Sequence, residues 1–320
     1  MRTDLVHPGA ENLKYEIRGI VEVAKQIEKL GTPIIWENIG DPVAKGEQVP
    51  EWIKEYVIAA VRENKSFGYS PTKGVDAARE YIAKERNLEG GIQIKPDDIL
   101  FFNGLGDAIS TLYDHLHPSA RVIGPNPAYP THSSAEAAHA DSAHITYNLD
   151  PHKGWEPDLV ELEEKIKANP DIAGILIINP DNPTGLVYSV ETISAMVDIA
   201  RRHKLFLISD EIYSNLAFSG SGMQKLAQVV AEVPAIAMRG ISKEFPWPGA
   251  RCGWIEFYNR DKDENFDRYA ESLVNAKMLE VCSTTLPQTV LPQVMSDERY
   301  YPYLKTRIDA YDLRSQRAVE

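Results

Sequence analysis

Five polar residues in the middle of the chain have side chains that together could form a site with a nucleophile and a cation that binds an anion. They are Asn182, Asp210, Tyr213, Lys243 and Arg251, in this order along the sequence. A lysine near other cations in a partly desolvated pocket can act as an amine nucleophile and proton carrier. An arginine can bind a phosphate through two parallel hydrogen bonds, and an aspartate can pair with a protonated ring nitrogen. We therefore expect these side chains to lie in one site.

This set of side chains matches what pyridoxal phosphate needs. The cofactor requires a lysine for a Schiff base, a carboxylate for its pyridine nitrogen, donors for its phenolic oxygen and a cation for its phosphate. Each residue alone has a simpler explanation, since Asp210 and Tyr213 could be a helix cap with a packed tyrosine, and most lysines are solvated surface charges. It is their joint placement that favours the cofactor.

Strand and helix patterns alternate through the chain, which is typical of an α/β fold with a parallel sheet. The apolar run 172–178 is hydrophobic on both alternating faces, as in a strand covered by helices on both sides. We predict strands over 99–103, 120–124, 144–147, 172–179, 205–210, 235–242 and 252–258. We predict helices over 50–64, 107–116, 131–140, 158–168, 190–203, 266–281 and 302–320.

The candidate residues follow predicted strands, where an α/β sheet binds its ligands. Asn182 lies in a turn that two prolines and a glycine make rigid, so its amide is a fixed donor. Gly104, Leu105 and Gly106 open a helix, whose free backbone amides can bind a phosphate. Tyr129 follows the second strand and could stack on a flat cofactor or simply pack against the protein.

Composition and charge exclude several classes of function. The hydrophobic fraction of 43% and charged fraction of 25% are those of a globular protein. The net charge of -13 opposes binding of nucleic acid or anionic membranes through overall charge. The longest apolar run is too short to cross a membrane, and the N-terminus lacks the apolar core of a signal peptide. We therefore expect a cytoplasmic protein with no nucleic acid or membrane partner.

The two cysteines, Cys252 and Cys282, do not form a metal-binding or disulfide pattern. They are far apart in the sequence, and the chain contains neither a CxxC pair nor an HExxH motif. We expect no metal site.

Four motifs together resemble the class I/II aminotransferases of fold type I. They are Asn179-Pro-Asp-Asn-Pro-Thr-Gly185, Asp210-Glu-Ile-Tyr213, Ser242-Lys243 and Gly249-Ala-Arg-Cys-Gly253, in the order and at the distances of that family. The resemblance extends from about Tyr15 to the end of the chain. It implies a three-layer α/β/α large domain with a mostly parallel sheet and a smaller α+β domain.

The resemblance also implies roles for individual residues. Lys243 would form the Schiff base and then move a proton between the substrate and the cofactor, Asp210 would pair with the pyridine nitrogen, and Asn182 and Tyr213 would hold the phenolic oxygen. The other implied cofactor contacts are ring stacking by Tyr129, and phosphate binding by Gly104, Leu105, Gly106, Ser242 and Arg251. Gly240 departs from the family, because many members have a phosphate-binding serine there.

Motifs nearer the N-terminus look most like the alanine (glutamate-pyruvate) aminotransferase branch. Tyr69, in Gly68-Tyr-Ser-Pro-Thr-Lys-Gly74, matches a tyrosine that reaches the phosphate of the neighbouring subunit, which implies a homodimer with shared sites. Gly40 matches a glycine beside the substrate carboxylate. Substrate contacts are also implied for Tyr15, Arg18 and Asn182.

We therefore expect an aminotransferase that moves an amino group between a small amino acid, of the alanine, glutamate or aspartate type, and a 2-oxo acid. Two other functions remain open. One is a β-eliminating lyase or decarboxylase that uses the same cofactor, and the other is a non-catalytic ligand-binding domain with an aminotransferase-like fold. Retention of the full set of cofactor residues weighs against the second.

The resemblance implies three regions: an N-terminal arm with the first part of the small domain (1–49), the large cofactor-binding domain (50–290) and the start of the C-terminal small domain (291–320). Members of the family bind the substrate carboxylate through an arginine in the C-terminal part of that small domain. The last predicted helix reaches Glu320 without a glycine cap. We therefore expect the natural protein to continue past Glu320, or the 320 residues alone to be catalytically poor.

Overall fold

A computed structural model describes residues 6–13, 16–36 and 40–319 of the chain. Its centre is an eight-stranded sheet with the order β1-β8-β7-β6-β5-β2-β3-β4. Strand β8 runs antiparallel to both of its neighbours, β4 runs antiparallel to β3, and the remaining neighbouring pairs are parallel. The strands are β1 (Ile99–Phe102), β2 (Arg121–Asn126), β3 (Thr146–Asp150), β4 (Glu156–Pro157), β5 (Ile172–Ile178), β6 (Phe206–Asp210), β7 (Ala235–Gly240) and β8 (Gly253–Tyr258).

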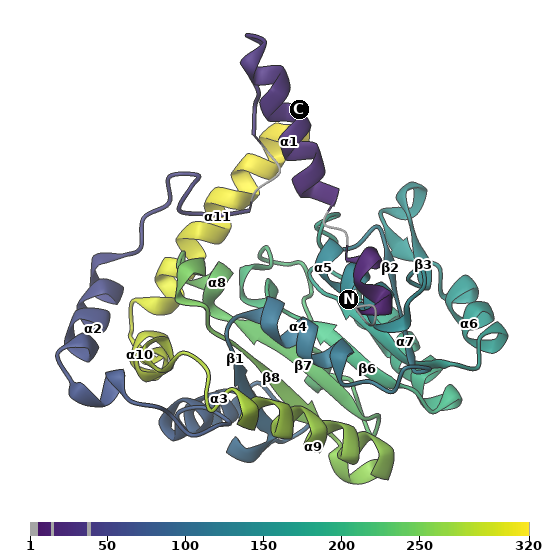
Figure 1. Cartoon of the computed structure of the whole chain (residues 1–320). Coiled ribbons are helices and arrows are strands. Elements are labelled where there is room, and N and C mark those ends of the chain that lie inside the picture. Colours follow the sequence, from purple (N-terminus) through teal and green to yellow (C-terminus); the bar gives the residue numbers. More distant parts are fainter. Residues whose placement is uncertain (1–5, 14–15, 37–39, 320) are drawn as a thin grey trace.

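Helices cover both faces of this sheet, with α4 and α9 in front of it in Figure 1. One hydrophobic core joins the sheet to α2, α3, α6, α7 and α10, and a second core on the other face joins it to α4 and α9. The helices are α1 (Glu16–Lys29), α2 (Glu51–Val61), α3 (Asp76–Leu88), α4 (Leu105–Asp114), α5 (Pro130–Ala140), α6 (Leu159–Ala168), α7 (Val190–His203), α8 (Ile241–Glu244), α9 (Glu264–Leu279), α10 (Thr285–Ser296) and α11 (Tyr300–Val319).

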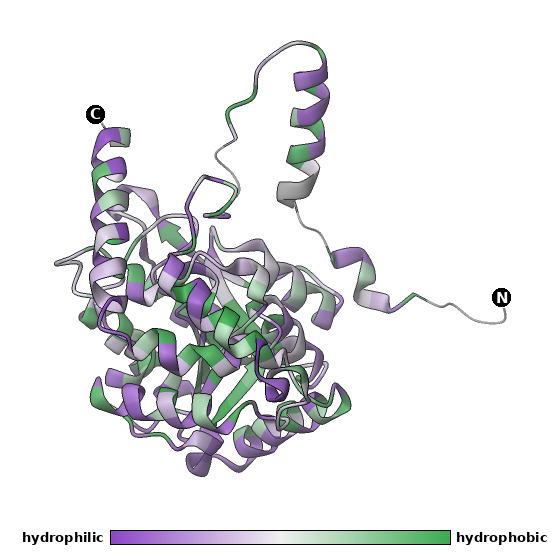
Figure 2. Cartoon of the chain, turned by 90° about the vertical axis from the view of Figure 1, so that its left-hand side faces the viewer, coloured by the Kyte–Doolittle hydropathy of each residue, from purple (hydrophilic) through white to green (hydrophobic). Residues whose placement is uncertain are grey.

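Strand β5 shows why the sheet has two cores. Ile175 and Ile177 point into the first core, while Leu176 and Ile178 point into the second. Successive side chains of a strand face opposite sides, so a run of apolar residues needs cover on both faces. Figure 2 shows apolar residues concentrated on the central strands. The predicted three-layer α/β fold is confirmed.

Helix α1 extends away from the sheet on the same side as α11 (Figures 1 and 2). Its side chains Ile20, Val23 and Ile27 are apolar and exposed. Of the helices that the structure describes, none is long and apolar enough to cross a membrane.

A buried ion-pair network connects the ends of β6 and β7. The guanidinium of Arg239 lies 2.9 Å from the carboxylate of Glu211 and 3.6 Å from that of Glu256. Glu256 also accepts hydrogen bonds from Trp254 and Tyr258. Because Glu211 directly follows Asp210 and Arg239 precedes Lys243 by four positions, the network holds the backbone beside two candidate site residues.

The variant Arg239→Met should lower the free energy of unfolding by about 3 to 5 kcal/mol, because it leaves Glu211 and Glu256 buried without their cation. Urea unfolding followed by circular dichroism would measure the change. As a matched control, Arg201→Met removes an exposed pair with Asp198 and should cost less than about 1 kcal/mol. Equal losses in both variants would contradict a stabilising role for the buried network.

Candidate active site

The carboxyl ends of four strands bring the predicted residues to one edge of the sheet. Asn182 follows β5, Asp210 ends β6, Lys243 follows β7 and Gly104 follows β1. Strand β1 runs parallel to β7, because both are antiparallel to β8. The common direction of these strands is therefore what gathers the four residues.

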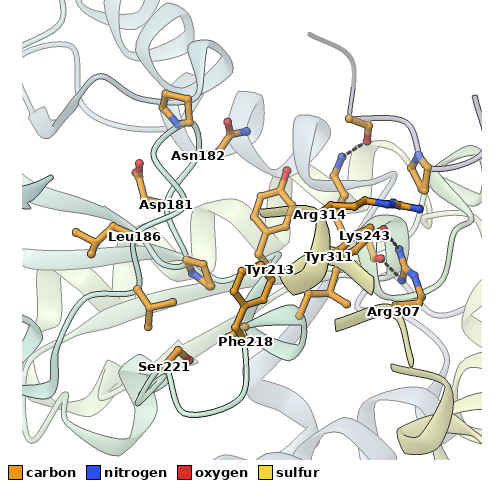
Figure 3. A pocket seen from close by; sticks show the side chains of 18 of the residues that line it. Asp181, Asn182, Leu186, Tyr213, Phe218, Ser221, Lys243, Arg307, Tyr311 and Arg314 are labelled. Atoms are coloured by element: carbon orange, nitrogen blue, oxygen red, sulfur yellow. Dashed lines mark hydrogen bonds between the residues drawn. The ribbon is translucent and has the colours of Figure 1, made fainter. Parts of the chain in front are cut away.

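A cavity of about 760 Å³ opens at this edge. Its lining includes four predicted site residues, Gly40, Asn182, Tyr213 and Lys243. Residues of α11 line it beside Lys243, across from Asn182 (Figure 3). Asp210, Tyr129, Ser242, Arg251, Tyr69 and the segment 104–106 are outside that lining.

Lys243 lies on the one-turn helix α8 and is half-buried. Its Nζ donates a hydrogen bond to the Gly40 carbonyl at 2.7 Å and lies 5.7 Å from the centre of the Tyr213 ring. A Cβ atom at Gly40 would lie 3.4 Å from Nζ, so a larger residue would crowd the amine. Burial lowers the pKa of Lys243 below its ordinary value, while the charges of Asp41 and Asp210 raise it by less.

This lowered pKa predicts the pH dependence of amine reactivity, since only the neutral amine attacks an aldehyde. The rate at which a small aldehyde modifies Lys243 should reach half of its maximum at a pH below the lysine value of about 10.4. In Asp41→Asn the midpoint should fall further, because a carboxylate that raises the pKa is lost. Reductive trapping with peptide mass spectrometry would measure it, with Asp309→Asn on the exposed face of α11 as the control. A midpoint at the ordinary lysine value would contradict the prediction.

Asp210 is buried and is contacted by the Ile212 amide and by His132, which in turn contacts Tyr113. Its Oδ1 accepts a hydrogen bond from the Ile212 amide at 3.1 Å, and its Oδ2 lies 3.2 Å from Nε2 of His132. Nδ1 of His132 is 3.4 Å from the Tyr113 hydroxyl. A Tyr113 hydroxyl that donates to Nδ1 leaves the ring proton on Nε2, which then donates to Asp210 and orients that carboxylate.

Sequence reasoning missed His132. It lies three positions after Tyr129, in the first turn of α5, and this proximity to a predicted cofactor contact was the available signal.

Hydrogen bonds inside the turn that follows β5 fix the position of Asn182. The Asn179 side chain accepts from the Tyr188 amide at 3.0 Å, and Asp181 accepts from the Thr184 amide at 3.1 Å and from its hydroxyl at 2.6 Å. Asn182 itself is half-buried and faces the cavity (Figure 3). The rigid turn expected from the sequence is present.

A second group of residues, which would form an anion cradle, lies at the start of α4. Gly104 has a φ of 82°, and a Cβ atom there would lie 2.6 Å from Nη2 of Arg251. The close approach of that guanidinium to the backbone therefore depends on the glycine. Within the described part of the chain no side chain caps the start of α4, so the amides of Leu105 and Gly106 are available beside Arg251. These donors fit a phosphate.

The structure places the remaining predicted residues as follows. Ser242 belongs to α8, because β7 ends two residues earlier than the predicted strand, and it is half-buried next to Lys243. Tyr129 precedes α5 and packs against the second core, and Tyr69 is 86% exposed. Tyr15 lies outside the described residues, and Arg18 belongs to α1.

Gly240 lies where the backbone is crowded. A Cβ atom there would be 3.0 Å from the Cys252 carbonyl and 3.1 Å from the Cα of Gly253. The close packing of β7 against β8 therefore leaves little room for a side chain at position 240.

Metal ligands are not grouped in this region. Among the described residues, no three His, Cys, Asp or Glu side chains could hold a metal ion together. An amine, a buried carboxylate, two neutral donors and an anion cradle at one sheet edge instead fit a phosphorylated aromatic aldehyde.

Comparison with known proteins gives the same class. A family model described as aminotransferase class I and II matches residues 33–320. An uncharacterized aminotransferase of Methanocaldococcus jannaschii is 52% identical over 320 residues, which is 100% of this chain and 74% of the relative. An alanine aminotransferase of Mycobacterium tuberculosis is 34% identical over 248 residues, and the match spans 77% of this chain but only 57% of the relative.

The fold is also that of solved aminotransferase structures. The structure of an alanine aminotransferase from Pyrococcus furiosus has a TM-score of 0.89 and 26% identity, and the match covers 99% of this chain and 78% of the other. The chain belongs to the class I and II aminotransferases, a family of pyridoxal phosphate-dependent enzymes.

Proposed function

We propose that this chain is the cofactor-binding part of a cytoplasmic enzyme that moves an amino group between a small amino acid and a 2-oxo acid. The observation that carries the proposal is the half-buried Lys243 amine, which shares a cavity with Asn182, Tyr213 and the Gly40 carbonyl. An amine with a lowered pKa can hold an aldehyde covalently and can also accept a proton at neutral pH.

Each group of the site would hold one part of pyridoxal phosphate. Lys243 would hold the aldehyde carbon, Asp210 the pyridine nitrogen, and Asn182 and Tyr213 the phenolic oxygen. The phosphate would lie at the start of α4, with Ser242 and Arg251 around it, and Tyr129 would stack on the ring. When bound, the cofactor supplies an electron sink for charge that develops on the substrate's α carbon.

The protein's own residues would then position and move a proton. The Lys243 amine would take the proton from the substrate's α carbon as a general base and would deliver it as a general acid to the carbon that held the cofactor's aldehyde. Asp210 would be held in position by His132 and by the Ile212 amide, which both contact its carboxylate.

For the substrate we propose amino acids of the alanine, glutamate or aspartate type. The names of the relatives from Mycobacterium tuberculosis and Pyrococcus furiosus support alanine as one of them. Gly40 would lie beside the substrate carboxylate, and Tyr15 and Arg18 would cover the substrate from the N-terminal arm.

A panel of amino donors with pyruvate or 2-oxoglutarate as acceptor tests the proposal. We expect a new amino acid to accumulate in proportion to the 2-oxo acid formed from the donor. Release of pyruvate and ammonia without an acceptor would instead indicate a lyase, and protein that binds the cofactor but never transforms a substrate would indicate a binding domain.

We also propose a homodimer with shared sites. Phe67, Tyr69, Met278 and Leu279 are exposed apolar residues from two segments. Hydrogen bonds from Thr285 to Gly68 and from Thr72 to Val281, both 3.0 Å, hold these segments together. A second copy would cover this patch and bring its Tyr69 to the first copy's phosphate. Light scattering that gives a monomer at micromolar concentration would contradict the dimer.

A further inference from the structure

Helix α8, which carries Lys243, is only four residues long, and its last carbonyl groups are bound from outside the helix. Nη1 of Arg307, on α11, donates to the Lys243 carbonyl and to the Glu244 carbonyl, both at 2.6 Å. The last carbonyls of any helix lack partners within it, so a guanidinium at this point fixes the end of the turn. Arg307 is 64 positions away from Lys243 in the sequence.

Two further donors of Arg307 bind side chains. Its Nε donates to Glu47 at 2.9 Å, and its Nη2 donates to the Tyr311 hydroxyl at 2.8 Å. Tyr311 in turn donates to the second carboxylate oxygen of Glu47. Arg307 lines the cavity but is only 7% exposed, so its charge is committed to Glu47 and to the two carbonyl groups.

Glu47 ends a short segment that also contacts the Lys243 amine. The Glu47 amide donates to the Pro42 carbonyl at 2.9 Å, and Asp41 accepts from the Val43 amide at 2.9 Å, so residues 40–47 form one compact turn. Gly40, at the start of that turn, accepts the hydrogen bond from Nζ of Lys243. The same guanidinium therefore holds both the backbone of Lys243 and the segment that receives its amine.

We propose that Arg307 is a positioning residue that holds the Lys243 amine next to the 40–47 turn. The ion pair of Glu47 and Arg307 links this turn to the short helix that carries Lys243. The inference rests on the proposed function, because it concerns how the lysine is held for cofactor capture. The alternative role, a ligand that binds the substrate carboxylate through two parallel hydrogen bonds, would need two free donors. Four of the five N–H groups of this guanidinium already have acceptors.

Stopped-flow absorbance of the cofactor-free chain mixed with pyridoxal phosphate tests this role. Arg307→Met should slow the capture of pyridoxal phosphate by Lys243 on the order of tenfold. It should also shift the pH at which the capture rate reaches half of its maximum. Arg307→Lys should restore part of the rate, since an ammonium can pair with Glu47 but lacks the planar fork that reaches both carbonyls. Lys305→Gln, on the exposed face of the same helix, should behave like the unmodified chain.

Glu47→Gln provides a second, milder test that does not depend on Arg307→Met folding. It should slow capture in the same direction, and the double variant should be no slower than Arg307→Met alone, because the two side chains act together. Thermal unfolding confirms that each variant is folded. Folded Arg307→Met and Glu47→Gln with unchanged capture rates would overturn the inference, as would an effect confined to the KM of the amino acid. Failure of the unmodified chain to capture pyridoxal phosphate would instead refute the proposed function.

Discussion

Replacing Lys243 with alanine should remove the visible absorbance of bound pyridoxal phosphate and lower amino transfer by roughly 10⁴-fold. The change deletes the covalent anchor and the proton carrier together, while the rest of the cavity lining remains. Absorbance after addition of cofactor, and borohydride reduction followed by peptide mass spectrometry, would measure the first effect. A coupled assay of the 2-oxo acid would measure the second.

Lys84→Ala is the matched control, because Lys84 is exposed on α3 and far along the chain from the site. This variant should keep both the absorbance and the turnover. Turnover by Lys243→Ala at more than about a hundredth of the unmodified rate would refute the role of this lysine, since general acid-base catalysis alone contributes about 10² to 10⁴.

Asp210→Asn should lower kcat by roughly 10² to 10³, which is the usual effect of losing one preorganised electrostatic contact. The asparagine oxygen can still accept from the Ile212 amide, so the local backbone should persist. The charge that keeps a pyridine nitrogen protonated is lost, however, and with it the electron sink. Steady-state kinetics with saturating cofactor would measure the change.

The variant Asp210→Glu separates charge from geometry, because it keeps the carboxylate and should recover part of kcat. His132→Phe should have a smaller effect than Asp210→Asn, since it removes only the group that orients the carboxylate. Full activity in Asp210→Asn would contradict the proposed pairing with the pyridine nitrogen.

Much of the fold could be predicted because the strands carry strong local patterns. Each of the seven predicted strands overlaps an observed strand, with bounds that differ by up to three residues, and β4 was missed because it has only two residues. Helix α10 was missed because it contains Pro292 in its interior, which argues against a helix. Its buried face, with Val290 and Leu291, packs on α2 and α3 and outweighs that local cost. The antiparallel direction of β8 depends on pairing, which no local pattern encodes.

The same limit applies to the site. The strand ends gather Asn182, Asp210 and Lys243, as expected, because a parallel sheet places these ends at one edge. Arg307 and His132 were not predicted, since their partners lie 64 and 78 positions away along the chain. Side chains of this kind act through contacts that only the packed structure creates. The three-region division and the individual cofactor roles stay predictions.

The antiparallel direction of β8 also fixes the separation of two proposed cofactor anchors. Gly240 pairs with Gly253, so residues 241–252 leave the sheet and return to it at a single point. This segment carries Lys243 near its beginning and Arg251 near its end. The spacing between the proposed covalent anchor and the proposed phosphate anchor is thus set by the length of one short segment. A single inserted residue would disturb both ends of the ligand at once, whereas the loops at the opposite edge of the sheet are free of that constraint.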